Sequence, residues 1–348
     1  MKMKAAFYLE PEKIEVREAK KPICHQGEIL LKVSYCAICG TDVRTYLHGH
    51  KKVHPPHIIG HEIAGEIAEI GKGVKGCRVG ERVTVVTSVG CGRCRWCRKG
   101  LYNLCPEGKA IGYFYPGGFA EYLLMPKKGV LQNLILKIPK NVELLEASII
   151  EPLSCCLHGQ SYLNIKKNDS VAIFGAGPIG MMHLELAKEK GASKTFLIDI
   201  SEEKLKFARK YFSADRFING DKENPAEKIL SFTKNNGVDV VIVAAPAKVA
   251  QQQALKIAGK KARVSFFGGL PGNDSIIAFD SNFLHYNEIS VFGSFASNRV
   301  EYVQALNLIA SGKIKAKNFI THQLPLERIE EGFGLLRKGK ALKVVLKI

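Results

Sequence analysis

The stretch VAIFGAGPIG, residues 171–180, decides the fold of the second half of this chain. Its apolar residues predict a buried strand that ends at Phe174, and the glycine-rich turn that follows leads into a predicted helix. The turn reads G-x-G-x-x-G, with glycines at positions 175, 177 and 180. The first glycine permits a tight turn, the second lets the backbone approach a pyrophosphate, and the third lets the helix pack on the strand. The stretch therefore predicts a dinucleotide site at a helix N-terminus.

Predicted strands and helices alternate from this stretch onward. In chain order they are the strand Val171–Phe174, the helix Pro178–Lys190, the strand Thr195–Asp199, the helices Glu202–Tyr211 and Ala226–Thr233, the strand Val238–Ala244, the helix Val249–Ala258 and the strand Ala262–Phe267. Such alternation is typical of a doubly wound parallel sheet, so this part of the chain is predicted to be of the α/β class.

Asp199 ends the second predicted strand and indicates which dinucleotide binds. A carboxylate there accepts hydrogen bonds from ribose hydroxyls and repels a 2′-phosphate, so NAD(H) is predicted rather than NADP(H). Lys204 would favour the phosphate, and Ser201 is the better candidate for capping the next helix. The predicted coenzyme contacts are Gly175, Gly177, Pro178, Ile179, Gly180, Asp199 and Lys204, with Ala244 and Phe267 added because they follow later strands.

The first part of the chain has a different rhythm, with short β-runs broken by glycines. The runs are Ile29–Tyr35, Ile63–Ile70, Arg82–Thr87 and Ala120–Met125, a pattern typical of a barrel or sandwich. A length of 348 residues favours two domains. The predicted division is residues 1–152, residues 153–291, and a tail, 292–348, that returns to the first domain through the helix Val300–Ser311 and the strand Leu342–Ile348.

Four cysteines, Cys91, Cys94, Cys97 and Cys105, have the spacing C-x2-C-x2-C-x7-C. Four thiolates can close a tetrahedral shell around one Zn²⁺, and a closed shell leaves no position for substrate. The alternatives are a disulfide cluster or four unrelated buried thiols, but nothing marks the chain for export and chance spacing this regular is rare. The spacing predicts a structural zinc lobe at residues 88–106.

A second motif lies upstream of the cysteines. Residues 60–74 contain G-H-E-x2-G-x5-G-x2-V, and Cys39 is followed by Gly-Thr-Asp. With the cysteine lobe, these motifs resemble the zinc-containing medium-chain alcohol and polyol dehydrogenases, in the branch of sorbitol, threonine and sugar-alcohol-phosphate dehydrogenases. The resemblance covers essentially the whole chain, including Thr321-His322 and the ending Gly339–Leu346. It implies a GroES-like β-barrel catalytic domain joined to a Rossmann coenzyme domain.

The resemblance also implies roles for individual residues. Cys39 and His61 match two ligands of a catalytic zinc, Glu151 stands at the position of the third, and Glu62 shares or exchanges the metal with it. Three protein ligands leave one position open for an alcohol, and zinc lowers the pKa of its hydroxyl so that hydride can pass to the nicotinamide. Thr41 matches the hydroxyl that passes the alcohol proton outward. The implied cofactors are two Zn²⁺ per subunit and NAD(H).

Nearby cysteines and histidines have simpler interpretations. Cys36 and Cys39 form a C-x-x-C, but no βαβ unit surrounds it, so a redox role is not favoured for Cys36. Cys155, Cys156 and His158 follow Glu151 and are predicted to pack against neighbouring side chains.

The implied reaction oxidises a secondary alcohol, either a polyol, a sugar alcohol or its phosphate, to a ketone. L-Threonine and butanediol are the alternative substrates. Residues 293–297, Gly-Ser-Phe-Ala-Ser, replace the Arg-Tyr pair with which animal sorbitol dehydrogenases hold a polyol, and Arg44 stands where threonine dehydrogenases carry a histidine. Arg44 or Lys51 could instead meet a phosphate.

Composition bears on the remaining function classes. The net charge of +18, from 51 Lys and Arg against 33 Asp and Glu, would suit nucleic acid or a phosphorylated substrate, but no basic stripe is interleaved with aromatics. No apolar run approaches the roughly 18 residues of a membrane span, and no secretory signal is apparent, so a cytoplasmic location is expected. A zinc-free quinone reductase would lack the cysteine lobe and the His-Glu pair. A homotetramer or homodimer is implied by the resemblance alone.

Overall fold

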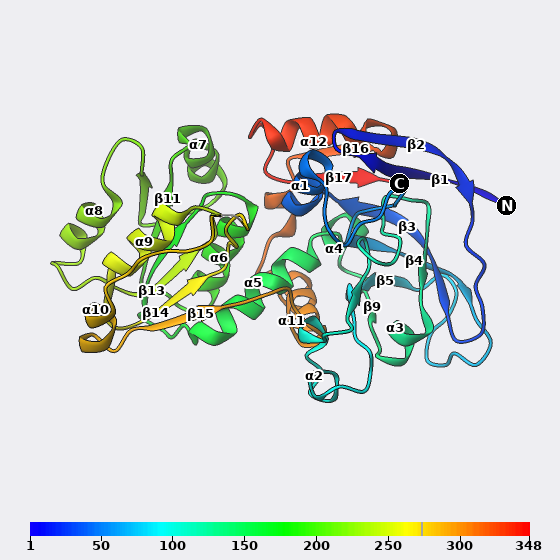
Figure 1. The fold of residues 1–348 in the computed structure, drawn as a ribbon, viewed down its shortest axis with the longest axis horizontal. Coiled ribbons are helices and arrows are strands. Elements are labelled where there is room, and N and C mark those ends of the chain that lie inside the picture. Colours follow the sequence, from blue (N-terminus) through cyan, green and yellow to red (C-terminus); the bar gives the residue numbers. More distant parts are fainter. Residues whose placement is uncertain (273) are drawn as a thin grey trace. The chain divides into compact units, whose positions relative to one another are not determined.

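The structure, a computed structural model, describes residues 1–272 and 274–348. These residues fall into two units, one formed by Met1–Ser154 with Ala296–Ile348 and the other by Cys155–Phe295. The chain passes from the first unit to the second within helix α5 (Ile150–Leu163). Each unit is built on a sheet of its own, as the ribbon shows (Figure 1).

The first unit contains a seven-stranded sheet with the order β16-β17-β3-β4-β5-β9, in which β8 also pairs with β3. These strands are β3 (Ile29–Ala37), β4 (Glu62–Ile70), β5 (Arg82–Val85), β8 (Tyr122–Met125), β9 (Ile135–Lys137), β16 (His322–Pro325) and β17 (Val344–Lys347). A hairpin of β1 (Lys2–Glu10) and β2 (Lys13–Lys20) and a short pair of β6 (Ser88–Val89) and β7 (Lys109–Ala110) accompany it. Leu30, Leu31 and Ile67 are fully buried and form part of its core.

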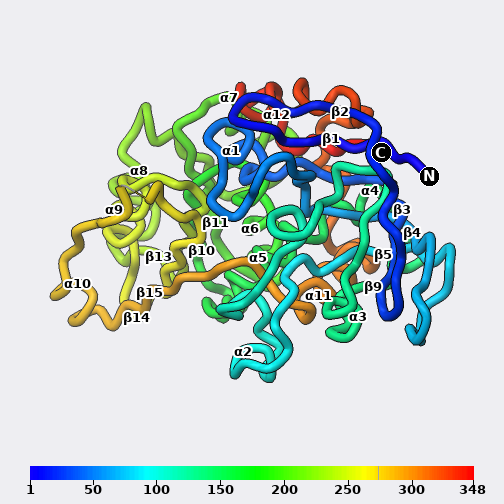
Figure 2. Tube along the Cα trace, turned by 45° about the vertical axis from the view of Figure 1, so that its right-hand side comes forward, coloured from blue at the N-terminus to red at the C-terminus, as the bar shows by residue number. Residues whose placement is uncertain are grey.

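The C-terminal strand β17 pairs antiparallel with β3, so that Val345 lies opposite Ala37 and Leu346 opposite Cys36. Figure 1 shows the red strand β17 beside the blue strand β3, and Figure 2 marks the C-terminus near the labels of β1 and β3. The end of the chain therefore reaches the strand that leads directly to Cys39.

The second unit contains a six-stranded parallel sheet in the order β12-β11-β10-β13-β14-β15. The strands are β10 (Ser170–Phe174), β11 (Lys194–Asp199), β12 (Arg216–Asn219), β13 (Val238–Val243), β14 (Ala258–Phe266) and β15 (Ser290–Gly293). Numbered within the unit, this is the order 3-2-1-4-5-6 of the Rossmann fold, whose dinucleotide crevice lies where the order reverses, beside β10. The predicted doubly wound parallel sheet is confirmed.

The helices of this unit lie close to the predicted ranges. They are α6 (Pro178–Glu189), α7 (Glu202–Tyr211), α8 (Pro225–Phe232), α9 (Lys248–Lys256) and α10 (Ser281–Tyr286). Helix α7 has the predicted bounds and is capped by Ser201, whose Oγ accepts from the Lys204 backbone N–H. The predicted helix Val249–Ala258 was wrong at its end, because Ala258 pairs with Val238 and begins β14.

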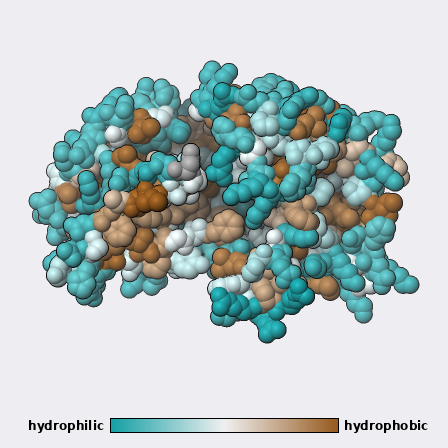
Figure 3. Space-filling view, in the orientation of Figure 1, coloured by the Kyte–Doolittle hydropathy of each residue, from teal (hydrophilic) through white to brown (hydrophobic). Residues whose placement is uncertain are grey.

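Side chains on the face drawn in Figure 3 are hydrophilic over most of the surface, with hydrophobic groups in small separate areas. In the part of the chain that the structure describes, no helix combines the length and the apolar composition that a membrane crossing requires.

Gly65 in β4 lies opposite Val33 of β3, where the two backbones approach closely. A Cβ at Gly65 would lie 2.2 Å from the Lys32 carbonyl oxygen, so we expect Gly65→Ala to lower the free energy of unfolding by about 2–3 kcal/mol. Gly334, in α12 (Ile329–Arg337), is the control: a Cβ there meets no atom within 4 Å, and Gly334→Ala should stabilise by up to about 1 kcal/mol. Urea unfolding of the zinc-loaded protein measures both, and equal effects would contradict the role of close packing at Gly65.

Candidate metal centres and coenzyme site

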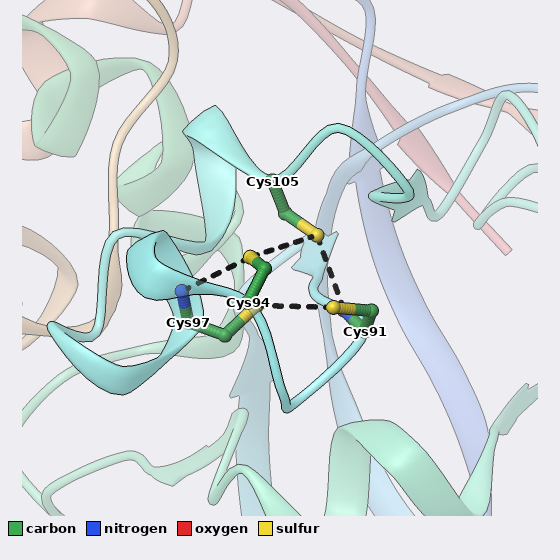
Figure 4. Close-up of side chains that lie close together, drawn as sticks. All are labelled: Cys91, Cys94, Cys97 and Cys105. Atoms are coloured by element: carbon green, nitrogen blue, oxygen red, sulfur yellow. Dashed lines mark hydrogen bonds between the residues drawn. The ribbon is translucent and has the colours of Figure 1, made fainter.

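The four cysteines of the predicted lobe point their sulfur atoms toward one another (Figure 4). Cys91 follows β6, Cys94 and Cys97 hold the first turn of α2 (Arg95–Arg98), and Cys105 follows the short helix η1 (Tyr102–Leu104). Cys94 caps α2, since its Sγ accepts from the Cys97 backbone N–H at 3.5 Å. Local backbone structure thus brings all four thiols to one point.

The distances between these sulfur atoms fit a metal and not a disulfide. Sγ of Cys91 lies 3.9 Å from Sγ of Cys97, and Sγ of Cys94 lies 3.8 Å from Sγ of Cys105. A tetrahedron with Zn–S bonds of about 2.3 Å has S···S edges of about 3.8 Å, whereas a disulfide needs about 2.05 Å. The lobe is a structural four-cysteine zinc site, and the disulfide alternative is wrong.

The surroundings of the four thiols differ. Backbone N–H groups of Arg93 and Cys94 lower the pKa of Cys91 to about 6, whereas burial raises the pKa of Cys97 to about 12. Zinc binds thiolates, so the ion must displace a firmly held proton from Cys97. The lobe is therefore expected to lose its metal in acid, where protons compete with zinc for the thiolates.

A second cluster consists of Cys39, His61 and Glu62, whose ligand atoms all lie within 4.8 Å of one another. Cys39 is the N-cap of α1 (Gly40–His48), and its Sγ accepts from the Thr41 backbone N–H at 3.4 Å. His61 and Glu62 are buried at the start of β4. Sulfur, imidazole and carboxylate together are a donor set that suits zinc.

Asp42 lies beside the imidazole of His61. Its carboxylate Oδ2 accepts from the Cys39 backbone N–H at 2.9 Å and completes the cap of α1. Its Oδ1 lies 3.3 Å from His61 Nδ1 without forming a hydrogen bond, so its charge acts on the imidazole at close range. Both side chains are buried.

Lys343 forms a buried ion pair with Glu62 that the sequence analysis did not anticipate. Its Nζ lies 2.5 Å from Glu62 Oε1 and donates to the Ile38 carbonyl oxygen at 3.1 Å. Burial would lower the pKa of Lys343, but the charges of Glu62, Cys39 and Glu151 raise it, so the side chain carries its proton. A lysine near the C-terminus, immediately before a short strand, is the only signal that the sequence offered.

The second oxygen of Glu62, Oε2, is buried and has no hydrogen-bond partner among the residues that the structure describes. A buried carboxylate oxygen without a donor is costly unless a cation meets it. Because the Glu62 carboxylate is grouped with Cys39 and His61, a metal ion at this cluster would satisfy the orphaned oxygen.

The other predicted catalytic residues lie around this cluster. Thr41 is half-buried in the first turn of α1, and Glu151 lies in the first turn of α5. Among the described residues the carboxylate grouped with Cys39 and His61 is that of Glu62, and Glu151 is outside the 4.8 Å group. The charge of Glu151 nevertheless acts on Tyr113 and Lys343, so it lies in the same neighbourhood.

Two cysteines outside the ligand groups are packing residues, as predicted. Cys36 is fully buried in β3, and burial raises the pKa of its thiol well above the usual value, so it is an unreactive side chain. Cys156 is fully buried in α5, where its Sγ contacts the Ile179 carbonyl oxygen at 3.7 Å.

The three motif glycines of the second unit meet three different surroundings. Gly175 has φ of +107°, which side chains rarely adopt, and a Cβ at Gly180 would lie 1.7 Å from the Gly175 carbonyl oxygen. A Cβ at Gly177 would meet nothing within 4 Å. The open space beside Gly177, at the N-cap of α6, is where a pyrophosphate needs to approach the backbone.

Asp199 lies beside this turn, at the carboxyl end of β11. Its Oδ2 accepts from the Ala176 backbone N–H at 2.7 Å and its Oδ1 from that of Ser201 at 2.8 Å, so the carboxylate is held in place. Each oxygen keeps a lone pair for a further donor. Lys204 is exposed on α7.

The remaining predicted coenzyme contacts occupy the same edge of the sheet or the start of α6. Pro178 and Ile179 are half-buried at the first two positions of α6, and Ala244 directly follows β13. Phe267 follows β14, and its ring meets that of His183 edge-on at 4.6 Å. Its ring therefore packs against α6, which the sequence pattern did not indicate.

Two family models match the chain in the order of its domains. Residues 25–139 match the alcohol dehydrogenase GroES-like domain, and residues 178–311 match the zinc-binding dehydrogenase domain. The predicted fold class, a GroES-like domain with a Rossmann domain, is confirmed.

Solved structures resemble the whole chain. A zinc-binding dehydrogenase from Sinorhizobium meliloti, bound to NADP, is 31% identical with a TM-score of 0.92, and the match covers 100% of both chains. An alcohol dehydrogenase from Escherichia coli, complexed with NADH, is 28% identical with a TM-score of 0.90, and the match covers 100% of this chain and 99% of that one.

Curated relatives also match over nearly the full length. L-Threonine 3-dehydrogenase of Pyrococcus furiosus is 35% identical over 99% of this chain and 98% of its own. Sorbitol dehydrogenase of Bacillus subtilis is 33% identical over 99% of this chain and 97% of its own. With the four-cysteine site and the Cys39, His61 and Glu62 cluster in place, the chain belongs to the zinc-containing medium-chain dehydrogenase family.

Proposed function

We propose that this protein oxidises a secondary alcohol, either a polyol, a sugar alcohol or its phosphate, to the ketone, with NAD as hydride acceptor. The observation that carries the proposal is the cluster of Cys39, His61 and Glu62, with its orphaned carboxylate oxygen, in a family of alcohol dehydrogenases. L-Threonine is the second candidate substrate, favoured by the full-length likeness to the Pyrococcus enzyme. Butanediol is a third possibility of the same reaction class.

In the first unit, different residues would bind the metal and transfer the alcohol proton. Cys39, His61 and Glu62 would hold the zinc, and Glu151 would be the carboxylate that shares or exchanges the metal with Glu62. Zinc bound there polarises the alcohol oxygen and lowers the pKa of its hydroxyl. The hydroxyl of Thr41, two residues from Cys39, would receive the alcohol proton and pass it outward.

Lys343 is a positioning residue in this proposal. Because its Nζ lies 2.5 Å from Oε1 of Glu62, Oε2 is the carboxylate oxygen left without a hydrogen bond and available to a metal. Its positive charge also offsets the negative charges of Cys39, Glu62 and Glu151, which would otherwise accumulate in a buried site. The pair would let Glu62 hold the metal through one oxygen while Lys343 keeps the other oxygen.

The second unit supplies the coenzyme site. The open backbone at Gly177 and the N-terminus of α6 suit the pyrophosphate, and the Asp199 carboxylate suits the ribose hydroxyls of NAD. Asp199 would repel the 2′-phosphate of NADP, which favours NAD for this chain although one similar structure holds NADP. A cytoplasmic homodimer or homotetramer is inferred from likeness to the family.

Zinc should restore activity to chelated protein. We expect NADH formation from a secondary alcohol to rise with added Zn²⁺, because the metal cluster requires its ion, and Cys39→Ala/His61→Ala to abolish turnover. Absorbance of NADH follows the reaction, and elemental analysis should show two zinc ions in the wild type and one in the double variant. Turnover by the double variant would overturn the proposal.

Removing the Lys343 charge should destabilise the metal-free protein. In chelator, Lys343→Met leaves Glu62 buried without its cation and should lower the free energy of unfolding by about 3–5 kcal/mol. Zinc should recover part of that loss, which urea unfolding with and without Zn²⁺ measures. Lys343→Arg keeps the charge, and Lys347→Met, at an exposed position of β17, is the control. Equal stability of Lys343→Met and Lys347→Met in chelator would refute the positioning role.

Substitutions at two of the motif glycines should affect different properties, one the affinity for NADH and the other the thermal stability. Gly177→Ala places a methyl group in open space beside the helix N-terminus, so we expect an unchanged melting temperature and NADH binding weakened at least about tenfold. Gly180→Ala meets a carbonyl oxygen at 1.7 Å and should instead lower the melting temperature. Fluorescence titration with NADH and thermal unfolding give the two readouts. Normal NADH affinity in Gly177→Ala would contradict this site.

A further inference from the structure

We propose that Arg44, Lys51 and Lys52, together with the ring of His50, form a subsite for the phosphate group of a phosphorylated secondary alcohol. The proposal rests on the dehydrogenase function proposed above and selects, within it, the phosphate esters of sugar alcohols over free polyols and L-threonine. The residues involved lie on α1, whose N-cap is Cys39, and on the turn that follows the other end of α1.

The turn after α1 presents two lysines beside a fixed histidine. Helix α1 ends at Gly49, and the Val53 backbone N–H donates to the His50 carbonyl oxygen at 2.9 Å, which closes a turn with Lys51 and Lys52 at its tip. The Lys52 backbone N–H donates to His50 Nδ1 at 3.2 Å. Because Nδ1 accepts, the neutral ring carries its proton on Nε2 and has a donor to offer a ligand.

Aromatic contacts connect this turn to the metal cluster. The ring of His50 lies 5.0 Å from that of Tyr113, and Tyr113 lies 5.4 Å from the ring of His61. A single side chain, Tyr113, thus separates His50 from a proposed zinc ligand. A ligand whose hydroxyl reaches the metal could extend past Tyr113 to His50 and the lysines.

The charge around His50 is positive throughout. Burial, followed by the positive charges of Arg44, Lys52 and Lys51, lowers the pKa of His50, and no carboxylate is among the charged groups that act on it. Arg44, Lys51 and Lys52 are exposed and, within residues 1–272 and 274–348, form no ion pair and donate no side-chain hydrogen bond. Other cations of the same unit are paired, as Lys4 is with Glu327 and Lys317 with Glu143.

Three unpaired cations and a neutral donor suit a dianion. A phosphate monoester carries up to two negative charges and several acceptor oxygens, and arginine and lysine are its usual partners. L-Threonine is a zwitterion without net charge: its carboxylate would attract these cations and its ammonium group would be repelled by them, so it matches three cations less well than a dianion does. A free polyol has no charge, so it would leave the three cations without a partner.

The test compares matched substrates with the full-length, zinc-loaded protein. We expect kcat/KM for sorbitol 6-phosphate or galactitol 1-phosphate to exceed that for the free hexitol at least about tenfold. Lys51→Gln/Lys52→Gln, and separately Arg44→Gln, should reduce this preference roughly tenfold to 100-fold through KM for the ester. The preference should also fall as salt is raised.

The control is Lys127→Gln/Lys128→Gln, which removes the same charge from two exposed lysines on α3 (Lys127–Leu131). It should leave the preference unchanged. Equal use of ester and free hexitol by the wild type, better use of L-threonine, or a change confined to KM for NAD in the Lys51→Gln/Lys52→Gln or Arg44→Gln variants would overturn the proposal.

A binding measurement tests the phosphate subsite without requiring that the protein oxidise an alcohol. In calorimetric titration of the zinc-loaded protein with inorganic phosphate, Lys51→Gln/Lys52→Gln should weaken binding about tenfold or more, and the Lys127→Gln/Lys128→Gln control should not. If the protein oxidises no alcohol, the proposed function fails. The subsite is still supported if Lys51→Gln/Lys52→Gln loses phosphate binding and the control variant keeps it. Phosphate binding equal in both variants overturns the subsite even in an active enzyme.

Discussion

The need to neutralise buried negative charge governs the first unit. The Glu62 carboxylate is fully buried and lies close to the half-buried Cys39 and to His61, and a buried negative charge is costly unless a cation meets it. Lys343 supplies one cation, at 2.5 Å from Glu62. In the proposed metal centre a zinc ion would supply the other and would meet the unpartnered oxygen of Glu62.

This constraint explains why the end of the chain returns to its beginning. Lys343 reaches Glu62 because β17 pairs with β3 and fixes the backbone next to Ile38 and Cys39. The same strand pairing buries Val344, Val345 and Leu346, so hydrophobic burial holds the lysine in place. The C-terminal strand thus contributes to the metal cluster as directly as the motif at residues 60–62.

The second unit follows a different constraint, the close approach of backbone to backbone at the G-x-G-x-x-G turn. Gly180 permits α6 to pack on β10, and Gly177 keeps a space open at the helix N-terminus. The metal centre depends on buried charge and the coenzyme turn on the absence of side chains. Each unit therefore has its own sensitivity to substitution, one electrostatic and one steric.

The sequence by itself determined what depends on local spacing. The four-cysteine lobe, the G-x-G-x-x-G turn and the strand–helix alternation each follow from residues close in the chain, so their periodicity and spacing were sufficient. Only the tertiary structure decided which side chains from distant segments meet. Lys343 pairs with Glu62, and Tyr113 separates His50 from His61, because strand pairing and burial bring these segments together, and no local pattern records such contacts.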